Sequence, residues 1–335
     1  MISSNRQTDY ERAIQLLKPF TIKNTSKANF QFFFTFIMLW SSIYSSYYFL
    51  GNYNLVLLIT IPTTVVFLCR SYVILHDCGH NSFSNNKTWE NSVGTILGFG
   101  IMISFSMWRY IHNSHHNHVG NLDKREWNPE VWTMTIEEYK ASSLFKRLIY
   151  RFMRSRFTRF FIVPTINFGL IFRFLHPKFS RQVNLIVLIH DIIYVALIWF
   201  LLSYMSIITL VIVFFLPLAL FYNIAAFSLY TQHQFEETYW EKDENWNYFD
   251  ASFSGSNCVT APHWFRWMTG NVLYHNIHHL CSNIPSYKLD KAQKELGTLL
   301  NYKLIPISEG WNMLGKKLWD EENKKLVGFS SLRNK

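Results

Sequence analysis

The chain has 335 residues, of which 49% are hydrophobic and 18% aromatic, while only 16% are charged. So few charged side chains cannot cover a water-soluble protein of this size, which argues against an ordinary soluble fold. The net charge of +10 would suit a nucleic-acid-binding protein, but the basic residues lie beside long apolar stretches, as on the cytoplasmic face of a membrane protein. We therefore expect membrane lipids, and no nucleic acid, as partners.

The N-terminal residues 1–28 mix charges and contain no apolar signal-peptide core. They predict a cytoplasmic segment with an amphipathic piece around Tyr10–Leu17. The cysteines form no Cys-x-x-Cys pair, which favours a reducing, cytoplasm-facing environment; they are Cys69, Cys78, Cys258 and Cys281.

Two long stretches without a charged residue, 28–69 and 192–235, predict transmembrane helices. A helix needs about 20 residues to cross a bilayer core, so each stretch has room for two spans. The expected spans are 29–50 and 54–75 in the first hairpin, and 184–203 and 207–230 in the second.

The segments between the two hairpins are predicted to stay at the membrane surface. Residues 93–107 are apolar but short and glycine-rich, which favours a re-entrant or interfacial helix. Residues 140–181 contain ten Lys or Arg and no Asp or Glu, and their apolar part, 160–172, is expected in the interface. Because the turns within the hairpins lack Lys and Arg, both termini and the middle loop should be cytoplasmic.

Histidines are concentrated in three motifs and one isolated position. A His-x-x-His-His pattern occurs twice, and residues i, i+3 and i+4 share one face of a helix. The predicted topology places all of these histidines on one side of the membrane, which indicates a metal centre. The candidate ligands are His76, His80, His112, His115, His116, His233, His275, His278 and His279.

The number of imidazoles favours two metal ions, because nine histidines are too many for one closed four-ligand zinc site. Iron is preferred, since histidine sites with open positions can activate oxygen whereas zinc does not change its redox state. Zinc hydrolysis is the weaker alternative, as no His-Glu-x-x-His motif is present. A metal transporter would place its ligands in the middle of spans, whereas these histidines follow span ends.

Residues beyond this set are candidates for supporting roles. Carboxylates often accept a hydrogen bond from metal-bound histidines, and the candidates are Asp77, Asp123, Glu236, Glu237 and Asp250. Aromatic residues near the motifs are expected to line an apolar tunnel or to anchor the chain at the interface: Trp108, Tyr110, Trp127, Trp132, Trp264 and Trp267. His118 is expected to support the ligands without binding the metal, and His176 and His263 are expected in structural roles. His190 is expected outside the ligand set, at a position where it could hydrogen-bond Asp191.

The three histidine motifs resemble the histidine boxes of membrane fatty-acid desaturases, and neighbouring stretches resemble the acyl-lipid type. These stretches are His-Asp-Cys-Gly-His-Asn-Ser-Phe at 76–83, Gly-Asn-Leu-Asp at 120–123, Val-Trp-Thr-Met-Thr-Ile-Glu-Glu-Tyr at 131–139, Gln-His-Gln-Phe-Glu-Glu-Thr-Tyr-Trp at 232–240 and Gly-Asn-Val-Leu-Tyr-His-Asn-Ile-His-His-Leu at 270–280. The resemblance covers roughly residues 30–295. Three residues separate the histidines of the first box, where desaturases of coenzyme-A thioesters usually have four.

The resemblance implies a centre of two iron ions that uses O2 and two electrons to form a cis double bond in a lipid-linked acyl chain, in the delta-12 or omega-6 manner. The nine candidate histidines would hold the irons, His233 matching the family's extra histidine. No cytochrome b5-like extension is present, so a separate electron donor, of ferredoxin or cytochrome b5 type, is expected. A hydroxylase or ketolase of lipids or carotenoids on the same scaffold is the alternative.

The expected fold is an all-α integral membrane protein with four transmembrane helices in two hairpins, interfacial helices and a cytoplasmic helical cap. It would form a single domain over 1–335, in a bacterial inner membrane or, in a eukaryote, an ER or plastid membrane. Its expected parts are 1–28, 29–75, 76–183, 184–230 and 231–335.

Overall fold

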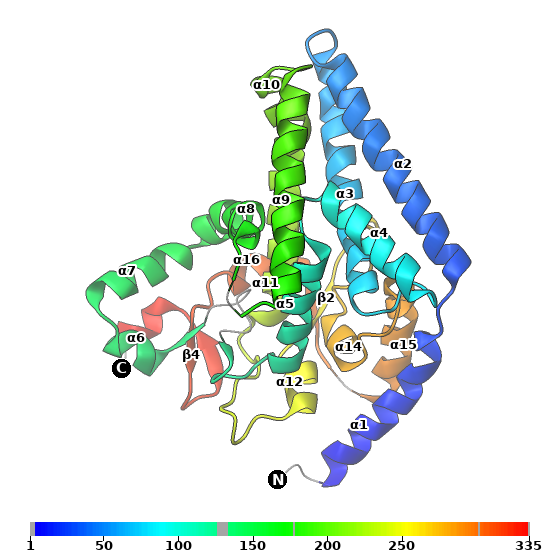
Figure 1. Ribbon diagram of the computed structural model, residues 1–335. Coiled ribbons are helices and arrows are strands. Elements are labelled where there is room, and N and C mark those ends of the chain that lie inside the picture. The colour runs from blue at the N-terminus through cyan, green and yellow to red at the C-terminus, as the bar shows by residue number, and fades with distance from the viewer. Residues whose placement is uncertain (1–3, 126–132, 177, 301, 334–335) are drawn as a thin grey trace. The chain divides into compact units, whose positions relative to one another are not determined.

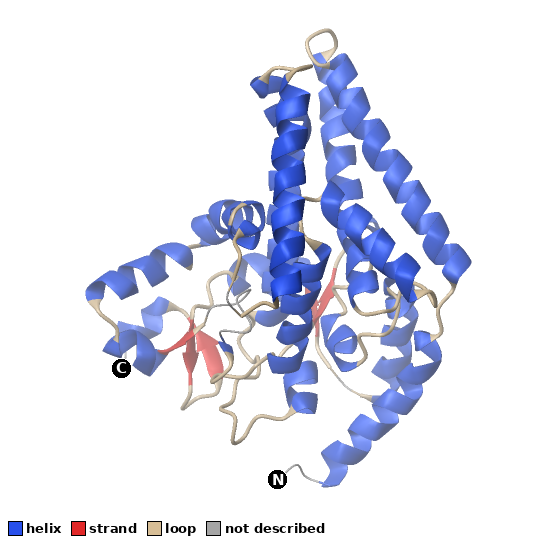
Figure 2. Ribbon diagram, in the orientation of Figure 1, coloured by secondary structure: helices blue, strands red, loops and turns tan. Residues whose placement is uncertain are grey.

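The computed structural model describes residues 4–125, 133–176, 178–300 and 302–333. The chain is mostly helical (Figure 2) and divides into two compact units, each described by itself. Unit 1 comprises Met1–Ile22, Ile111–Val163 and Ala226–Lys335, and unit 2 comprises Lys23–Tyr110 and Pro164–Ala225.

In unit 2, helices α2 (Thr25–Phe49) and α3 (Leu57–Gly79) run side by side (Figure 1). Part of their contact is made by small polar side chains: Ser46 Oγ donates to Thr60 Oγ1 at 2.8 Å, and Thr64 Oγ1 donates to Ser42 Oγ at 2.9 Å. The opposite side of α2 exposes large apolar side chains, among them Phe30. Small residues at a helix contact and bulky apolar residues outside are typical of helices packed within a bilayer.

Three helical stretches of the described residues are long and apolar enough to cross a membrane: Asn54–Gly79, Arg181–Leu202 and Ile207–His233. They coincide with three of the four predicted spans. The fourth prediction, 29–50, overlaps α2, whose many Ser and Tyr residues make it less apolar than the other three. The third stretch contains α10 (Ile207–Leu210), a π-helical turn (Val211–Phe215) and α11 (Leu216–His233), and the second is α9 (Arg181–Leu202).

The predicted apolar segment 93–107 is not one helix. It is divided between α4 (Lys87–Gly100) and α5 (Phe105–His118), whose axes differ by 102°. A Cβ on Gly94 would lie 2.6 Å from Cζ of Phe105, so the glycine permits the close approach of α5. The bent pair is either a broken span or a re-entrant hairpin.

Three side chains from other parts of unit 2 bind the main-chain carbonyls at this break. Tyr194 donates its hydroxyl hydrogen to the carbonyl of Phe99, and Tyr222 donates to that of Ile101 at 2.9 Å. Arg173 donates to the carbonyl of Met102. The last carbonyls of a helix have no partner within the helix, and these donors replace the water that an apolar environment excludes.

The structure corrects the expected hydrogen bond between His190 and Asp191, because Arg173 contacts both residues. Its Nη1 donates to Asp191 Oδ1 at 2.8 Å and lies 3.2 Å from His190 Nδ1, whereas His190 Nδ1 and Asp191 Oδ1 are 4.0 Å apart. The arginine therefore holds both residues.

Unit 1 is built from short elements. It includes α1 (Ser4–Leu17), which confirms the predicted amphipathic piece and packs against α15 (Leu289–Leu299). Five short strands in the described part of this unit correct the all-α expectation, because β1, β4 and β5 form one sheet and β2 and β3 form another. Strands of two or three residues are too short to leave a periodic pattern in the sequence. The remaining α-helices and strands of unit 1 among the described residues are α6 (Ile136–Ala141), α7 (Leu144–Met153), α12 (Tyr248–Ser254), α13 (His263–Met268), α14 (His275–Leu280), α16 (Gly310–Met313), β1 (Met134–Thr135), β2 (Cys258–Thr260), β3 (Leu304–Pro306), β4 (Leu318–Asp320) and β5 (Lys325–Val327). Helix α8 (Val163–Gly169) belongs to unit 2 apart from Val163.

Candidate metal centre

Four buried histidines of unit 1, from three helices, converge at their Nε2 atoms. His115 comes from α5, His233 is the last residue of α11, and His275 and His279 lie one turn apart on α14. Neighbouring Nε2 atoms are separated by 3.1 Å for His115 and His233, 2.9 Å for His233 and His275, 3.1 Å for His275 and His279, and 3.2 Å for His279 and His115. The four contacts form a closed ring.

A second group in the same unit contains His112, His116 and His278. The Nε2 atom of His116 lies 3.2 Å from that of His112 and 3.1 Å from that of His278. The two His-x-x-His-His motifs are thus divided in the same way. The first and last histidines of each motif, one helical turn apart, enter one group, and the middle histidine enters the other.

The contact between His233 and His275 fits a bound cation. Each ring has its Nδ1 beside a main-chain carbonyl, Gly255 O at 2.9 Å and Val272 O at 3.2 Å respectively. A carbonyl only accepts hydrogen bonds, so both Nδ1 atoms carry hydrogen, and in the neutral rings both Nε2 atoms present lone pairs to each other. A positive charge between the two facing lone pairs makes this approach favourable, and a bound metal ion would supply it. None of the acidic candidates from the sequence takes this supporting role at His233 or His275, and no motif marks Gly255 or Val272.

The protonation state of His279 agrees with metal binding. Burial, and then the neighbouring His116, hold the pKa of this imidazole well below its ordinary value. The ring is therefore uncharged at neutral pH, which is the form that binds a metal.

The spacing of the ring also bears on the kind of metal. Two ligand nitrogens bound at about 2.1 Å are about 3.0 Å apart when the bond angle is about 90°, and about 3.4 Å apart in a tetrahedron. The separations of 2.9 Å, 3.1 Å and 3.1 Å lie nearer the first value, and the fourth, 3.2 Å, lies between the two. The spacing therefore fits ligand nitrogens at about 90° better than nitrogens at the tetrahedral angle.

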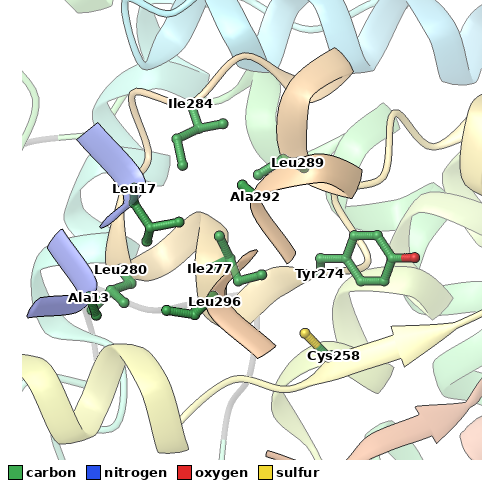
Figure 3. Close-up of a cluster of buried hydrophobic side chains, with 10 residues drawn as sticks. All are labelled: Ala13, Leu17, Cys258, Tyr274, Ile277, Leu280, Ile284, Leu289, Ala292 and Leu296. Carbon is green, nitrogen blue, oxygen red and sulfur yellow. The ribbon is translucent and has the colours of Figure 1, made fainter. Parts of the chain in front are cut away.

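Helix α14 is anchored on the face opposite its histidines. Ile277 and Leu280 enter a buried apolar cluster with Leu17 of α1 and Leu289 of α15 (Figure 3). The main-chain N–H groups of His275 and Asn276, at the start of α14, donate to the carbonyl oxygen of Asn257. The N···O distances are 3.1 Å and 3.3 Å respectively. A helix of six residues has little stability of its own, so these contacts position its three imidazoles.

The remaining two candidates, His76 and His80, belong to unit 2 and lie at the end of α3. Their ring centroids are 4.7 Å apart, and the ring of His76 lies 5.8 Å from Trp108 on α5. Gly79, between the two histidines, leaves room for that indole, because a Cβ there would lie 2.5 Å from Trp108 Cζ3. The glycine of the first motif thus has a packing role.

Several of the remaining candidates from the sequence have other contacts or lie at the surface. His118 bonds within its own helix through Ser114 O, and His176 and His263 are exposed. Glu236 pairs with Lys316, and Asp250 caps α12 together with Asn247. Trp108 is buried whereas Trp264 and Trp267 are exposed, and Trp127 and Trp132 lie outside the described residues.

The comparisons with known proteins agree with this geometry. The family model described as fatty acid desaturase matches residues 52–311. A fatty acid desaturase of Bacillus subtilis (strain 168) is 33% identical over 283 residues, which is 83% of this chain and 79% of the relative. An sn-1 oleoyl-lipid 12-desaturase of Picosynechococcus sp. is 28% identical over 250 residues, covering 72% of this chain and 70% of the relative.

A further relative is the sn-1 acyl-lipid omega-3 desaturase (ferredoxin) of Synechocystis sp., 25% identical over 275 residues and covering 74% of this chain and 69% of its own length. The family match covers more than half of the chain and includes every candidate histidine. The chain therefore belongs to the fatty acid desaturase family and is an oxidoreductase of fatty acyl chains.

Proposed function

We propose that this enzyme forms a cis double bond in an acyl chain that is esterified to a membrane lipid. Two hydrogens leave adjacent methylenes, and together with O2, two electrons and two protons they yield two waters. The observation that carries the proposal is the pair of converging imidazole groups in unit 1 of a desaturase-family chain. The lipid-linked substrate is supported by the printed names of the relatives, which differ in the position at which they act.

We further propose that His76 and His80 complete the group of His112, His116 and His278, so that the two units work as one domain over 1–335. Helix α5 supports this assignment. Its residue Trp108 contacts His76, and His112 follows one turn later on the same helix. The remaining group, with His115 and His233, would hold the second ion.

Iron is the metal that we propose for both positions. The uncharged, buried imidazoles would hold it, and iron would supply the reduction of O2 that a metal of fixed oxidation state cannot. The protein's own contribution is to fix the ligand nitrogens through the carbonyls of Gly255 and Val272 and to bury the rings. Burial keeps bulk water from the site.

The proposed setting is a multi-pass membrane protein whose α2 and α3 form the first hairpin, with α9 and α11 as the second. The histidines and both termini would face the cytoplasm, because the basic residues lie outside the uncharged stretches. Electrons would come from a separate ferredoxin or cytochrome b5-type protein. The ferredoxin in the printed name of one relative supports the first of these.

The test is to express the chain in a host of simple lipid composition and to profile fatty acids and intact lipids by mass spectrometry. We expect a new unsaturated acyl chain, recovered in a glycerolipid, that is lost in His278→Ala and retained in the exposed-site control His263→Ala. A product heavier by one oxygen atom would assign the hydroxylase alternative. Product in free acids or thioesters alone would contradict the lipid-linked substrate.

A further inference from the structure

Helix α7 (Leu144–Met153) has an exposed apolar face that the desaturase reaction does not explain. At about 100° per residue, five apolar side chains occupy one arc of about 140° around the helix. All five are exposed: Leu144 by 65%, Phe145 by 74%, Leu148 by 55%, Ile149 by 41% and Phe152 by 59%. A contiguous face of this kind is unfavourable in water.

The opposite side of α7 is anchored in unit 1. Tyr150 is fully buried, donates its hydroxyl hydrogen to the carbonyl of Lys317 at 2.5 Å and accepts from the N–H of Met134 at 3.0 Å. Its ring also packs against Phe329. The helix therefore presents its apolar arc outward because its other face is committed to the protein interior.

Basic side chains border the arc on both edges. Arg147 and Arg151 lie one helical turn apart on one edge of the arc, and Lys146 lies on the opposite edge. Long basic side chains beside an apolar helix face place their charges at headgroup level while their stems stay in the apolar layer. The pattern is that of a helix lying in the plane of a membrane surface.

The edge with the two arginines forms a groove of about 520 Å³. Its lining includes three cations, Lys140, Arg147 and Arg151, together with Leu144 and Leu148 of the apolar arc. No carboxylate is among the described residues that line it. Glu138 of the neighbouring α6 is engaged by Arg125 at 2.5 Å, so its charge is compensated.

We propose that α7 lies in the headgroup layer of the bilayer and that Lys140, Arg147 and Arg151 bind the phosphate of an anionic phospholipid, whose acyl chains cover Leu144 and Leu148. An acidic soluble protein fits less well, because it would leave the exposed leucines and phenylalanines of the arc in water. The continuity of three cations with an apolar face favours one ligand that carries both a phosphate and hydrocarbon chains.

The test titrates the purified full-length protein in neutral detergent with phosphatidylglycerol or phosphatidylcholine and measures bound lipid by native mass spectrometry. This readout requires neither metal nor turnover, so it stands apart from the desaturase proposal. We expect phosphatidylglycerol to bind at least tenfold more tightly than phosphatidylcholine. Arg147→Gln with Arg151→Gln should weaken phosphatidylglycerol about thirtyfold, or about fivefold per basic side chain, and leave phosphatidylcholine unchanged.

The charge-matched control is Lys291→Gln with Lys294→Gln on α15, which should bind phosphatidylglycerol as the wild type does. Because Arg151 also lies 4.6 Å above the Phe329 ring, Lys140→Gln with Arg147→Gln is measured as a second pair that spares this contact. The chain-free headgroup glycerophosphoglycerol should bind at least tenfold more weakly than the lipid.

Three results would overturn the proposal. Equal affinity for the two lipids would contradict a site for an anionic headgroup. An equal loss of phosphatidylglycerol affinity in the α15 control would show that the effect depends on net charge alone. Variants that bind phosphatidylglycerol normally but lose an acidic ferredoxin would make the same face a protein-docking surface.

Discussion

The Nε2 atoms of His233 and His275 lie 2.9 Å apart, although 42 residues separate the two histidines in the chain. Both rings donate their Nδ1 hydrogen to main-chain carbonyls, so the facing atoms are two acceptors. Such a contact is expected where an ion binds both, and it makes His233 the residue whose removal tests the metal assignment most directly.

His233→Ala should lower the iron content from about two ions to about one per chain, because this residue belongs to only one of the two proposed groups. Desaturation should fall by a factor of 100 or more, since loss of even a supporting partner of a ligand costs about 10–100-fold. Metal analysis by plasma mass spectrometry checks the first expectation and acyl-chain profiling the second.

His263→Ala, at an exposed position outside both groups, should keep both irons and full activity. Retention of two irons in His233→Ala would remove this residue from the ligand set. A wild-type chain with one zinc would contradict the di-iron proposal itself.

Gly79→Ala should destabilise the protein by about 1–3 kcal/mol, the usual cost of overpacking. The added Cβ would lie 2.5 Å from Trp108 Cζ3, and a buried indole between helices has little room to move. The apparent melting temperature in detergent measures the effect.

Gly169→Ala is the matched control, because no atom lies within 4 Å of its would-be Cβ and the change should be neutral or slightly stabilising. Combining Gly79→Ala with Trp108→Leu should restore part of the lost stability. If the double variant is no more stable than Gly79→Ala alone, the clash with this ring is not the cause.

Tyr222→Phe should destabilise the break between α4 and α5 by about 1–3 kcal/mol, because it leaves the carbonyl of Ile101 buried without its donor. The melting temperature should fall, and activity should fall with it, since α5 carries three candidate ligands directly beyond the break. Tyr204→Phe removes an equivalent hydroxyl from a side chain that is 67% exposed and should have no effect. Equal stability of the two variants would contradict a role for the hydroxyl of Tyr222.

Lys317 should make stability depend on pH. Burial, and then the nearby Arg154, lower the pKa of this amine to about 7 in the folded protein. The unfolded chain therefore binds a proton that the folded chain lacks between about pH 7 and the ordinary lysine pKa of about 10.4, and the free energy of unfolding should rise across that window. Below about pH 7 both states are protonated, and the cost of the buried charge is present in full.

The corresponding measurement compares melting temperatures at pH 6.5 and pH 9. The wild type should gain stability at the higher pH relative to Lys317→Met, whose apolar side chain does not titrate. Parallel behaviour of the two proteins would show that Lys317 is not the responsible group.

The ligand-bearing part of the fold could be predicted from the sequence because its signal is local. A His-x-x-His-His pattern places three imidazoles on one side of a helix whatever surrounds it, and uncharged stretches of sufficient length predict spans. The allocation of His115 and His278 to groups different from their neighbours could not be predicted. It depends on the direction from which each helix approaches, which only tertiary packing determines.

The side chains that bind main-chain carbonyls could not be predicted from the sequence either. The carbonyl of Gly255 orients His233, and Arg173 reaches a carbonyl 71 residues away at Met102. Carbonyls are present at every residue, so composition and spacing give no sign of which ones a side chain will bind. At His233 and His275 the Nδ1 partners are therefore carbonyls, which the sequence could not single out.

The closed ring of imidazoles joins segments up to 164 residues apart, since His115 meets His279. An ion held there acts as a cross-link that ties three helices together, and such a clip restricts the unfolded chain as a disulfide bridge would. With iron as the proposed ion, maturation of the enzyme should depend on iron supply. Iron-starved cells would then accumulate loosely folded chains that proteases degrade.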